Sequence, residues 1–220
     1  MYKVNEIFET LQGEGYFTGN PVIFIRLQGC PVECAWCDTK QTWAINPEDE
    51  TVFSNITRKY GDSALWANGT TAEIVNYIKT HYTAKQVVIT GGEPCSYDLL
   101  PLTQALEDNG YFCQIETSGT FLVTATSNTW VTLSPKINMR GKLPVLTQAL
   151  ERANEIKHPV ARESDLKALD KLIENIDISN KIMSLQPISQ GDRATALCMQ
   201  TCIKRNWRLS VQLHKYLNIA

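Results

Sequence analysis

Short apolar runs alternate with helix-like patterns along most of this 220-residue chain, and that alternation restricts the fold more than any other feature of the sequence. Runs rich in Val, Ile and Leu predict strands at 22–27, 86–90, 112–117, 130–133, 156–160, 182–186 and 208–213. Apolar residues at helical spacing predict helices at 70–81, 99–109, 145–154, 163–175 and 192–205. Strands separated by helices pair in parallel through right-handed crossovers, so the sequence predicts an α/β fold.

The length of the chain limits how many such units it can contain. A complete eight-unit (β/α) barrel takes roughly 250 residues, which is more than this chain has. The sequence therefore predicts a single domain over residues 1–220, built as an incomplete (β/α) barrel of about six parallel strands with an open side. Residues 44–69 are polar and rich in turn signals, and they predict an irregular, mobile insertion on the surface.

Composition disfavours several classes of partner. The 21 Lys and Arg residues against 23 Asp and Glu residues leave a net charge of −2, which is not typical of a nucleic-acid binder. The apolar runs are far shorter than the roughly 20 residues that span a bilayer, and residues 1–6 do not resemble a signal peptide. We therefore expect a cytoplasmic protein with neither a nucleic-acid nor a membrane partner.

Three of the seven cysteines, Cys30, Cys34 and Cys37, lie within eight residues in the loop after the first predicted strand. A loop of this length can turn three thiolates toward one point, and thiolates bind zinc or iron–sulfur clusters. A structural zinc site needs a fourth ligand, which the nearby sequence does not offer. The pattern favours a four-iron cluster with one open iron, and a zinc-stabilised binding module is the alternative. Cys198 and Cys202 are predicted to be buried core residues of a helix.

Further polar motifs follow the next predicted strands at their carboxyl ends. They are Gly91-Gly92-Glu93-Pro94, Glu116-Thr117-Ser118-Gly119-Thr120 and Ser134-Pro135-Lys136. The carboxyl ends of parallel strands meet at one edge of a sheet or barrel, which is where α/β proteins build their active sites. The sequence therefore predicts one site that contains the cysteine loop and these three motifs.

The cysteine motif, with Trp36 before its last cysteine, and the Gly-Gly-Glu-Pro motif together resemble the radical S-adenosylmethionine (SAM) superfamily. The resemblance implies a [4Fe–4S] cluster whose open iron binds SAM. It also implies that reductive cleavage of SAM yields a 5′-deoxyadenosyl radical, which abstracts a hydrogen atom. An activase that generates a glycyl radical on a partner protein would share both motifs, and it is a second alternative.

A longer set of motifs resembles the 7-carboxy-7-deazaguanine synthases of the queuosine pathway over essentially the whole chain. These motifs are Leu11-Gln12-Gly13-Glu14-Gly15, Arg26, Cys37-Asp38-Thr39, Gln186-Pro187-Ile188-Ser189 and His214-Lys215. The resemblance implies a lyase that converts 6-carboxy-5,6,7,8-tetrahydropterin to 7-carboxy-7-deazaguanine with loss of ammonia. It further implies Mg²⁺, regeneration of SAM, a homodimer and an electron donor such as a flavodoxin.

For such a substrate, Glu14 and Glu116 can accept hydrogen bonds from the guanidine-like edge, and Arg26 with Mg²⁺ at Thr39 can bind the carboxylate. The predicted substrate-binding residues are Leu11, Gln12, Gly13, Glu14, Arg26, Thr90, Glu116 and His214. The resemblance assigns SAM binding to Gly92, Glu93, Ser118, Ser134, Pro135, Lys136 and Gln186. Arg26 and Glu116 are also expected to compensate one another in part, because an unpaired buried charge is costly. Two of these residues have an alternative interpretation. His214 could be an ordinary surface residue, and Thr39 could cap its own loop through its hydroxyl.

Overall fold

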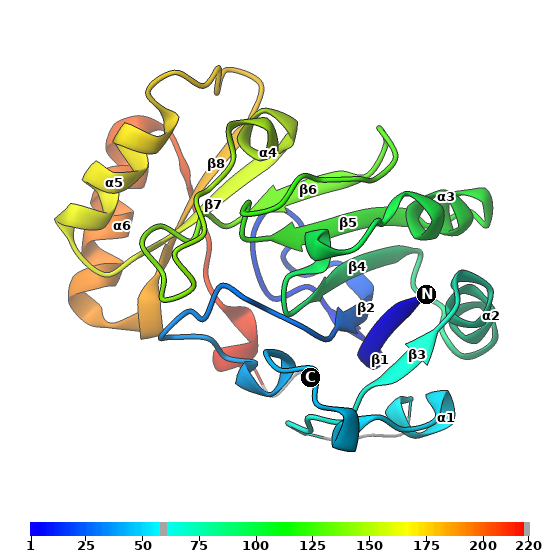
Figure 1. Ribbon diagram of the computed structural model, residues 1–220. Helices are drawn as coiled ribbons and strands as arrows, with labels where there is room; N and C mark the ends of the chain where they lie inside the picture. Colours follow the sequence, from blue (N-terminus) through cyan, green and yellow to red (C-terminus); the bar gives the residue numbers. More distant parts are fainter. Residues whose placement is uncertain (58–60, 218–220) are drawn as a thin grey trace.

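A single sheet of nine strands organises the protein, and the computed structural model describes residues 1–57 and 61–217 (Figure 1). The strand order is β3-β1-β2-β4-β5-β6-β7-β8-β9. In chain order the strands are β1 Tyr2–Leu11, β2 Pro21–Leu27, β3 Ala67–Gly69, β4 Gln86–Gly91, β5 Phe112–Thr117, β6 Trp130–Leu133, β7 Glu155–Val160, β8 Ile182–Pro187 and β9 Arg208–Leu209. Strands β2 and β4 to β8 are parallel, and the sheet is open between β3 and β9. The predicted incomplete barrel of about six parallel strands is confirmed.

In the described residues, six α-helices accompany the sheet. They are α1 Phe53–Ile56, α2 Thr71–His81, α3 Leu100–Asp108, α4 Thr147–Arg152, α5 Glu163–Ile173 and α6 Asp192–Arg205. Helix α2 begins where the sequence predicted, because Thr70 and Glu73 form a capping box: the Glu73 N–H donates to Thr70 Oγ1, and the Thr70 N–H donates to Glu73 Oε2. None of the helices in the described ranges is long and apolar enough to cross a membrane.

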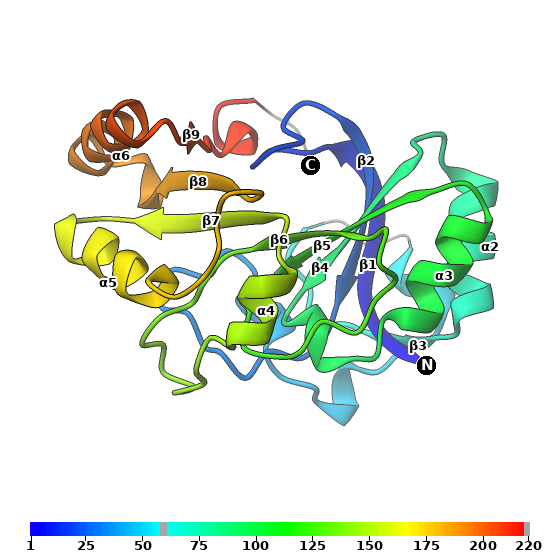
Figure 2. The same ribbon diagram turned by 90° about the horizontal axis from the view of Figure 1, so that it is seen from above.

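Helices α2 to α6 form two groups that pack against the sheet (Figure 2), and the short α1 contacts β1 and β3. Helices α2 and α3 cover the part of the sheet that contains β4 and β5, and α4, α5 and α6 cover β6 to β8. The apolar core accordingly has two clusters, of which the second includes Cys198 and Cys202 of α6. Both of these thiols are buried, as predicted.

The structure contains one long strand that was not predicted, and it shortens one strand that was. Strand β1 was not predicted, because Glu6 and Glu9 interrupt its apolar pattern, yet it forms a ten-residue strand that pairs antiparallel with β2 from Val4 to Leu11. The last predicted strand, 208–213, is shortened to Arg208–Leu209. Beyond Leu209 the backbone turns toward the loop that follows β1, where the Leu213 N–H donates to the carbonyl oxygen of Gly13 (2.8 Å).

The segment 44–69 contains short regular elements. Pro47–Asp49 forms one turn of 3₁₀ helix, α1 follows, and β3 at the end pairs antiparallel with β1. The Trp66 N–H also donates to the carbonyl oxygen of Asp49 (3.0 Å), so these described parts of the segment bond to one another and to the sheet. Residues 58–60, which belong to the same predicted insertion, lie outside the described residues.

The inner face of the sheet is polar, whereas the face covered by the helices is apolar. Gln114 of β5 donates to Thr132 of β6 (3.2 Å), and Thr132 donates to Glu155 of β7 (3.1 Å). Ser184 of β8 donates to the same Glu155 carboxylate (2.6 Å). Hydrogen bonds between side chains therefore cross four neighbouring strands, and they keep buried polar groups satisfied beneath the edge where the site lies.

Gly91 lies where β4 leaves the sheet, and we expect its replacement by Ala to destabilise the protein. Its φ is +129°, and an added Cβ would lie 2.2 Å from the backbone N and O of Leu27. Gly19 is a matched control, because its φ is also positive (+92°) but no atom lies within 4 Å of an added Cβ. Gly19→Ala should lower the free energy of unfolding by about 1 kcal/mol, and Gly91→Ala by at least about 2–3 kcal/mol. Urea denaturation of the cluster-free proteins measures both, and equal losses would contradict the backbone clash.

Candidate active site

Two adjoining cavities lie at the carboxyl ends of the parallel strands, at the edge where the sequence predicted a site. The first, here called the cysteine cavity, has a volume of about 250 Å³ and contains the three clustered cysteines. The second, here called the arginine cavity, has a volume of about 330 Å³ and contains Arg26. Their walls share Glu14, Asp38, Thr39, Thr90 and Glu116. Any ligand that fills one cavity therefore adjoins a ligand in the other.

The predicted residues separate between the two cavities. The arginine cavity is lined by Thr39 and by all the predicted substrate-binding residues, namely Leu11, Gln12, Gly13, Glu14, Arg26, Thr90, Glu116 and His214. The cysteine cavity is lined by Cys30, Cys34 and Cys37 and by the predicted SAM-binding residues Gly92, Glu93, Ser118, Ser134, Lys136 and Gln186. Pro135, the remaining predicted residue, does not belong to either wall.

Backbone hydrogen bonds close the cysteine loop at its base. The Gly29 N–H donates to the carbonyl oxygen of Thr42 (2.7 Å), and the Cys30 N–H donates to that of Trp43 (3.0 Å). The Cys37 sulfur accepts hydrogen bonds from the Thr39 N–H and from the Trp43 indole N–H, both at 3.4 Å. The loop therefore presents its thiols from a closed frame, and one of the three sulfurs already has two donors that would stabilise a thiolate.

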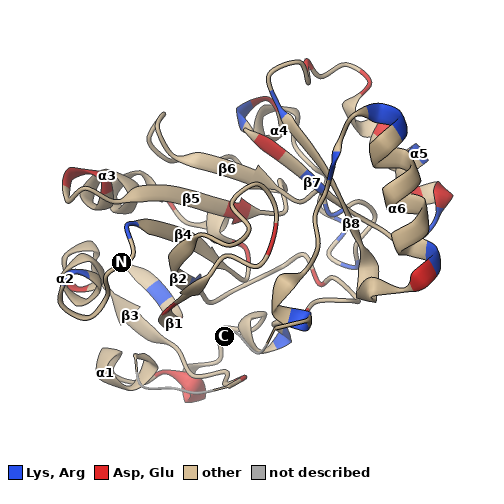
Figure 3. Ribbon diagram, turned by 180° about the vertical axis from the view of Figure 1, so that it is seen from behind, with Lys and Arg blue, Asp and Glu red and all other residues tan. Residues whose placement is uncertain are grey.

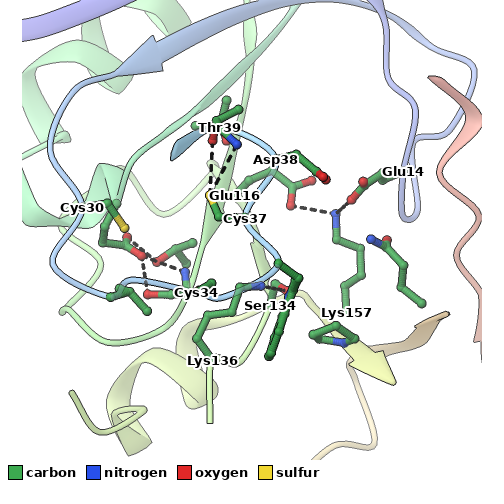
Figure 4. A pocket seen from close by; sticks show the side chains of 18 of the residues that line it. Glu14, Cys30, Cys34, Cys37, Asp38, Thr39, Glu116, Ser134, Lys136 and Lys157 are labelled. Atoms are coloured by element: carbon green, nitrogen blue, oxygen red, sulfur yellow. Dashed lines mark hydrogen bonds and ion pairs between the residues drawn. The ribbon is translucent and has the colours of Figure 1, made fainter. Parts of the chain in front are cut away.

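The thiols fit an iron–sulfur cluster that leaves one iron free. Figure 4 shows Cys30, Cys34 and Cys37 around one side of the pocket. In the described part of the chain, no three His, Cys, Asp or Glu side chains are arranged to hold a single metal ion. Burial raises the pKa of Cys30 to about 11. Burial also raises the pKa of Cys34, although the positive charge of Lys136 partly opposes this shift. Cluster assembly must therefore release protons from these thiols.

Glu93 joins the end of β4 to the end of β5. Its carboxylate accepts hydrogen bonds from the Cys95 N–H (3.0 Å), the Thr117 hydroxyl (2.6 Å) and both the N–H (2.8 Å) and the hydroxyl of Ser118. Glu93 is 1% exposed. The side chain is thus occupied by protein donors, so it shapes the wall of the cysteine cavity by connecting two strand ends.

Gly92, the residue after β4, packs directly against the cysteine loop. A Cβ at this position would lie 2.1 Å from the carbonyl oxygen of Gly29 and 3.1 Å from Cys30 Cβ. The Gly92 N–H donates to the carbonyl oxygen of Leu27 (2.8 Å), and the Glu93 N–H donates to that of Gly29 (2.8 Å). The residue type is therefore required by packing against the loop, independently of any ligand.

A buried lysine, Lys157, joins the two carboxylates that the cavities share (Figure 4). Its Nζ lies 2.8 Å from Glu14 Oε2 and 2.9 Å from Glu116 Oε2. Burial alone would raise the pKa of Glu14, but the charge of Lys157 and a hydrogen bond from Gln212 lower it to about 2. Burial, opposed by Lys157 and reinforced by the charge of Glu14, raises the pKa of Glu116 to about 7. The three groups therefore titrate as one coupled set.

The expected mutual compensation of Arg26 and Glu116 is wrong. Arg26 Nε lies 2.6 Å from Glu6 Oε1, because Glu6 is its cross-strand partner in the antiparallel pair β1–β2. Glu116 lies on β5, with β4 between it and β2, and it pairs with Lys157 instead. Each charge thus has a partner in the described residues, but not the partner that the sequence suggested.

Sequence reasoning missed Lys157, although the sequence contains a signal for it. Most charged residues lie on helices and loops (Figure 3). In the parallel strands β2 and β4 to β8, the Asp, Glu, Lys and Arg residues are Arg26, Glu116, Glu155 and Lys157. A charged residue in an apolar strand requires a partner or a ligand, and that argument, which was applied to Arg26 and Glu116, also applies to Lys157.

His214 lies against the loop that follows β1. A Cβ at Gly13 would lie 2.8 Å from His214 Nδ1, and the Leu213 N–H donates to the carbonyl oxygen of Gly13. The Gln212 amide donates to Glu14 Oε1 (2.8 Å). His214 is therefore a wall residue of the arginine cavity, whereas its neighbour Gln212 lines the cysteine cavity.

Comparisons with known proteins give one consistent set of relatives. The family described as "4Fe-4S single cluster domain" matches residues 11–143. The chain is 61% identical to 7-carboxy-7-deazaguanine synthase of Escherichia coli (strain K12) and 52% identical to that of Buchnera aphidicola subsp. Schizaphis graminum, with at least 99% of each chain covered. A crystal structure of QueE from Escherichia coli superposes with a TM-score of 0.94 at 59% identity, covering 97% of this chain and 94% of that one.

The raised pKa of Glu116 predicts a pH-dependent stability. A carboxyl whose pKa is about 7 when folded and near 4.5 when unfolded stabilises the folded state below about pH 4.5, and this contribution is lost as the pH rises through 7. Relative to Glu116→Gln, the wild-type free energy of unfolding should therefore fall between pH 5 and 7, by up to about 1.4 kcal/mol per pH unit. Urea denaturation of both cluster-free proteins measures this difference, and a difference that stays constant with pH would contradict the assignment.

Proposed function

Because this chain belongs to the 7-carboxy-7-deazaguanine synthase family of radical SAM enzymes, we propose that it converts 6-carboxy-5,6,7,8-tetrahydropterin to 7-carboxy-7-deazaguanine with loss of ammonia, in queuosine biosynthesis. The observation that carries the proposal is the arginine cavity, which brings residues from β1, β2, β4, β5 and the 212–214 segment together beside the cysteines. The relatives favour this function over a glycyl-radical activase and over a zinc-stabilised binding module.

The cysteine cavity is the proposed site of the cofactors. Cys30, Cys34 and Cys37 would hold a [4Fe–4S] cluster, and SAM would contact Gly92, Glu93, Ser118, Ser134, Lys136 and Gln186. Pro135, which the sequence predicted with them, lies between two of these residues and would act on SAM only by shaping the Ser134–Lys136 turn. When bound, the cluster and SAM supply the electron and the radical that remove a hydrogen atom from the substrate. Lys136 lies beside Ser134, with Nζ 2.5 Å from Oγ, and burial lowers the pKa of its ammonium.

The arginine cavity is the proposed substrate site, and its charges match the two ends of a carboxylated pterin. Arg26 supplies a guanidinium for the substrate carboxylate at one end. Glu14 and Glu116 supply acceptors for the guanidine-like edge at the other end. Thr90 and Gln12 add neutral hydrogen-bonding groups, and Leu11, Gly13 and His214 complete the wall. Fixing both ends orients the hydrogen atom that is removed, which is where positioning contributes most to rate.

Thr39 is the proposed Mg²⁺ ligand. It lies in the wall between the two cavities, two residues after Cys37. Although it precedes the 3₁₀ turn Lys40–Thr42, its side chain makes no capping hydrogen bond there, and within the loop its hydroxyl contacts Cys37 Sγ (3.7 Å). A hydroxyl oxygen has two acceptor lone pairs, so it can bind a cation while it keeps this contact. A Mg²⁺ ion held by this hydroxyl would take most of its remaining ligands from substrate and water.

The remaining expectations concern partners and location. We propose an external one-electron donor such as a flavodoxin, which could approach the cluster loop at Trp36, a side chain that is 39% exposed. A homodimer is supported by the exposed apolar residues Met199 and Ile203, one turn apart on α6. A cytoplasmic location is supported by seven free cysteines, since a reducing compartment keeps thiols available as metal ligands.

The proposed reaction is tested directly by anaerobic incubation of the reconstituted protein with SAM, a reductant, Mg²⁺ and 6-carboxy-5,6,7,8-tetrahydropterin. Mass spectrometry should detect 7-carboxy-7-deazaguanine, and its amount should exceed the amount of protein. Omission of SAM is the control. A preparation with a full complement of iron that consumes no pterin would overturn the proposal.

Each clustered cysteine should be required for the cluster. Cys30→Ala, Cys34→Ala and Cys37→Ala should each lose most of the iron and sulfide after anaerobic reconstitution, because a missing thiolate leaves a second iron without a protein ligand. Cys198→Ala and Cys202→Ala are matched controls, since these thiols lie in the core under α6, and both should retain the wild-type content. Chemical analysis of iron and sulfide checks this, and full iron content in Cys34→Ala would count against the site.

Replacement of Thr39 should separate Mg²⁺ binding from cluster binding. Thr39→Ala should keep its iron and still bind SAM, but its Mg²⁺-stimulated rate should fall by about 10- to 100-fold, because the substrate would lose one point of orientation. Thr80→Ala on the exposed face of α2 is the control, and its rate should not change. Iron content and the Mg²⁺ dependence of product formation are measured in one preparation. An unchanged response to Mg²⁺ in Thr39→Ala would exclude the residue as a ligand.

A further inference from the structure

Lys157 is a buried cation of the site, and neither the proposed cofactor contacts nor the proposed substrate contacts include it. It lies on β7, its side chain is 4% exposed, and its Nζ contacts Glu14 and Glu116. These carboxylates are 143 and 41 residues away from it in the chain. One ammonium therefore joins the loop after β1 to the centre of the sheet, at the point where the two cavities meet.

Lys157 approaches the two carboxylates from one side only. It lines the cysteine cavity but not the arginine cavity, whereas Glu14 and Glu116 line both. From the arginine cavity, the lysine is thus separated from a bound molecule by the carboxylates themselves. Its influence on a substrate in that cavity must pass through Glu14 and Glu116.

The second oxygen of each carboxylate is held by an amide. Gln114 Nε2 donates to Glu116 Oε1 (3.1 Å), and Gln212 Nε2 donates to Glu14 Oε1 (2.8 Å). Both amides are buried. Each carboxylate is therefore fixed at both oxygens, by the lysine on one and by an amide on the other. An ionised carboxylate has about four lone-pair positions, so both groups still have acceptor capacity for a ligand.

Charge determines what these two groups can offer to a ligand. Two carboxylates in one buried site do not both stay ionised without a cation, and the one that takes up a proton becomes a hydrogen-bond donor. A pterin presents the N–H groups of its guanidine-like edge, which require acceptors. A lumazine differs from a pterin in having an oxygen in place of the 2-amino group, so it requires a donor at that position.

We propose that Lys157 is a positioning residue that holds Glu14 and Glu116 as a pair of acceptors and thereby makes the arginine cavity selective for a guanidine-bearing heterocycle. The inference rests on the proposed function, because it takes the arginine cavity as the substrate site. Lys157 would thus determine selectivity although a substrate in the arginine cavity does not contact it. The selectivity depends on the charge of residue 157 and not on the volume of its side chain.

The test compares two stable ligands, pterin-6-carboxylate and lumazine-6-carboxylate, which differ only at the 2-position. Each is titrated calorimetrically at about pH 8, above the raised pKa of Glu116, so that both carboxylates of the wild type are ionised. The protein is anaerobic and cluster-loaded, with SAM and Mg²⁺ but without reductant, so that binding is measured without turnover. Wild-type protein should bind the pterin about 30- to 100-fold more tightly than the lumazine. A loss of this size is typical when a ligand presents an oxygen instead of an N–H donor to buried carboxylates. In Lys157→Met the preference should fall below about fivefold.

Two further variants separate charge from packing. Lys157→Arg keeps the positive charge and should keep the preference for the pterin, even if both affinities decrease. Lys157→Gln keeps N–H donors without the charge and should lose the preference, and it replaces Lys157→Met if that variant does not retain its iron. Lys167→Met, an exposed lysine of α5, is the control for the substitution and should match wild type.

The possible outcomes distinguish this inference from the proposed function. If wild-type protein binds neither ligand, the assignment of the substrate site fails. If wild type prefers the pterin and a neutral variant with full iron content weakens both ligands by the same factor, the selectivity role of Lys157 is overturned. If neither neutral variant retains iron, Lys157→Arg decides, because loss of the preference in that charged variant also overturns the role.

Discussion

Backbone hydrogen bonds that extend the pairing of β2 and β4 beyond the ends of these strands are the interaction on which the site depends. The Gly92 N–H bonds to Leu27, and the Glu93 N–H bonds to Gly29, so the cysteine loop and the Gly-Gly-Glu-Pro turn form one unit. The Glu93 carboxylate then connects this unit to Thr117 and Ser118 at the end of β5. Because backbone contacts leave no room for a Cβ at Gly92, this geometry follows from packing before any ligand binds.

The curved, open sheet explains how one small domain can contain two differently charged cavities. Its outer face packs apolar residues against the helices, and its inner face carries polar and charged side chains that bond to one another. A closed barrel fills its interior with side chains, whereas this sheet leaves space between β1, β2 and the 212–214 segment. The cysteine cavity and the arginine cavity therefore adjoin without merging, and a reaction between their ligands would take place at the shared wall.

The pattern of charges explains why the proposed substrate site is assembled from both ends of the chain. Arg26 is oriented by Glu6 in the neighbouring strand, which is a local pairing within an antiparallel ribbon. Glu14 and Glu116 are oriented by Lys157, Gln212 and Gln114, which come from three other parts of the sequence. The proposed carboxylate-binding end is thus oriented within one hairpin, whereas the proposed guanidine-binding end needs side chains from β5, β7 and the 212–214 segment.

The sequence by itself determined the parallel strands, most of the helices, the cysteine loop and the edge at which the chemistry gathers, because these depend on local periodicity and short motifs. It did not determine β1, whose pattern is interrupted by Glu6 and Glu9, or the partners of Arg26 and Glu116. Only the tertiary structure placed Lys157 between two carboxylates and separated the predicted residues into two cavities. The physical reason is that a buried charge requires a partner but does not specify which one, and the strand order decides which opposite charge comes within 3 Å.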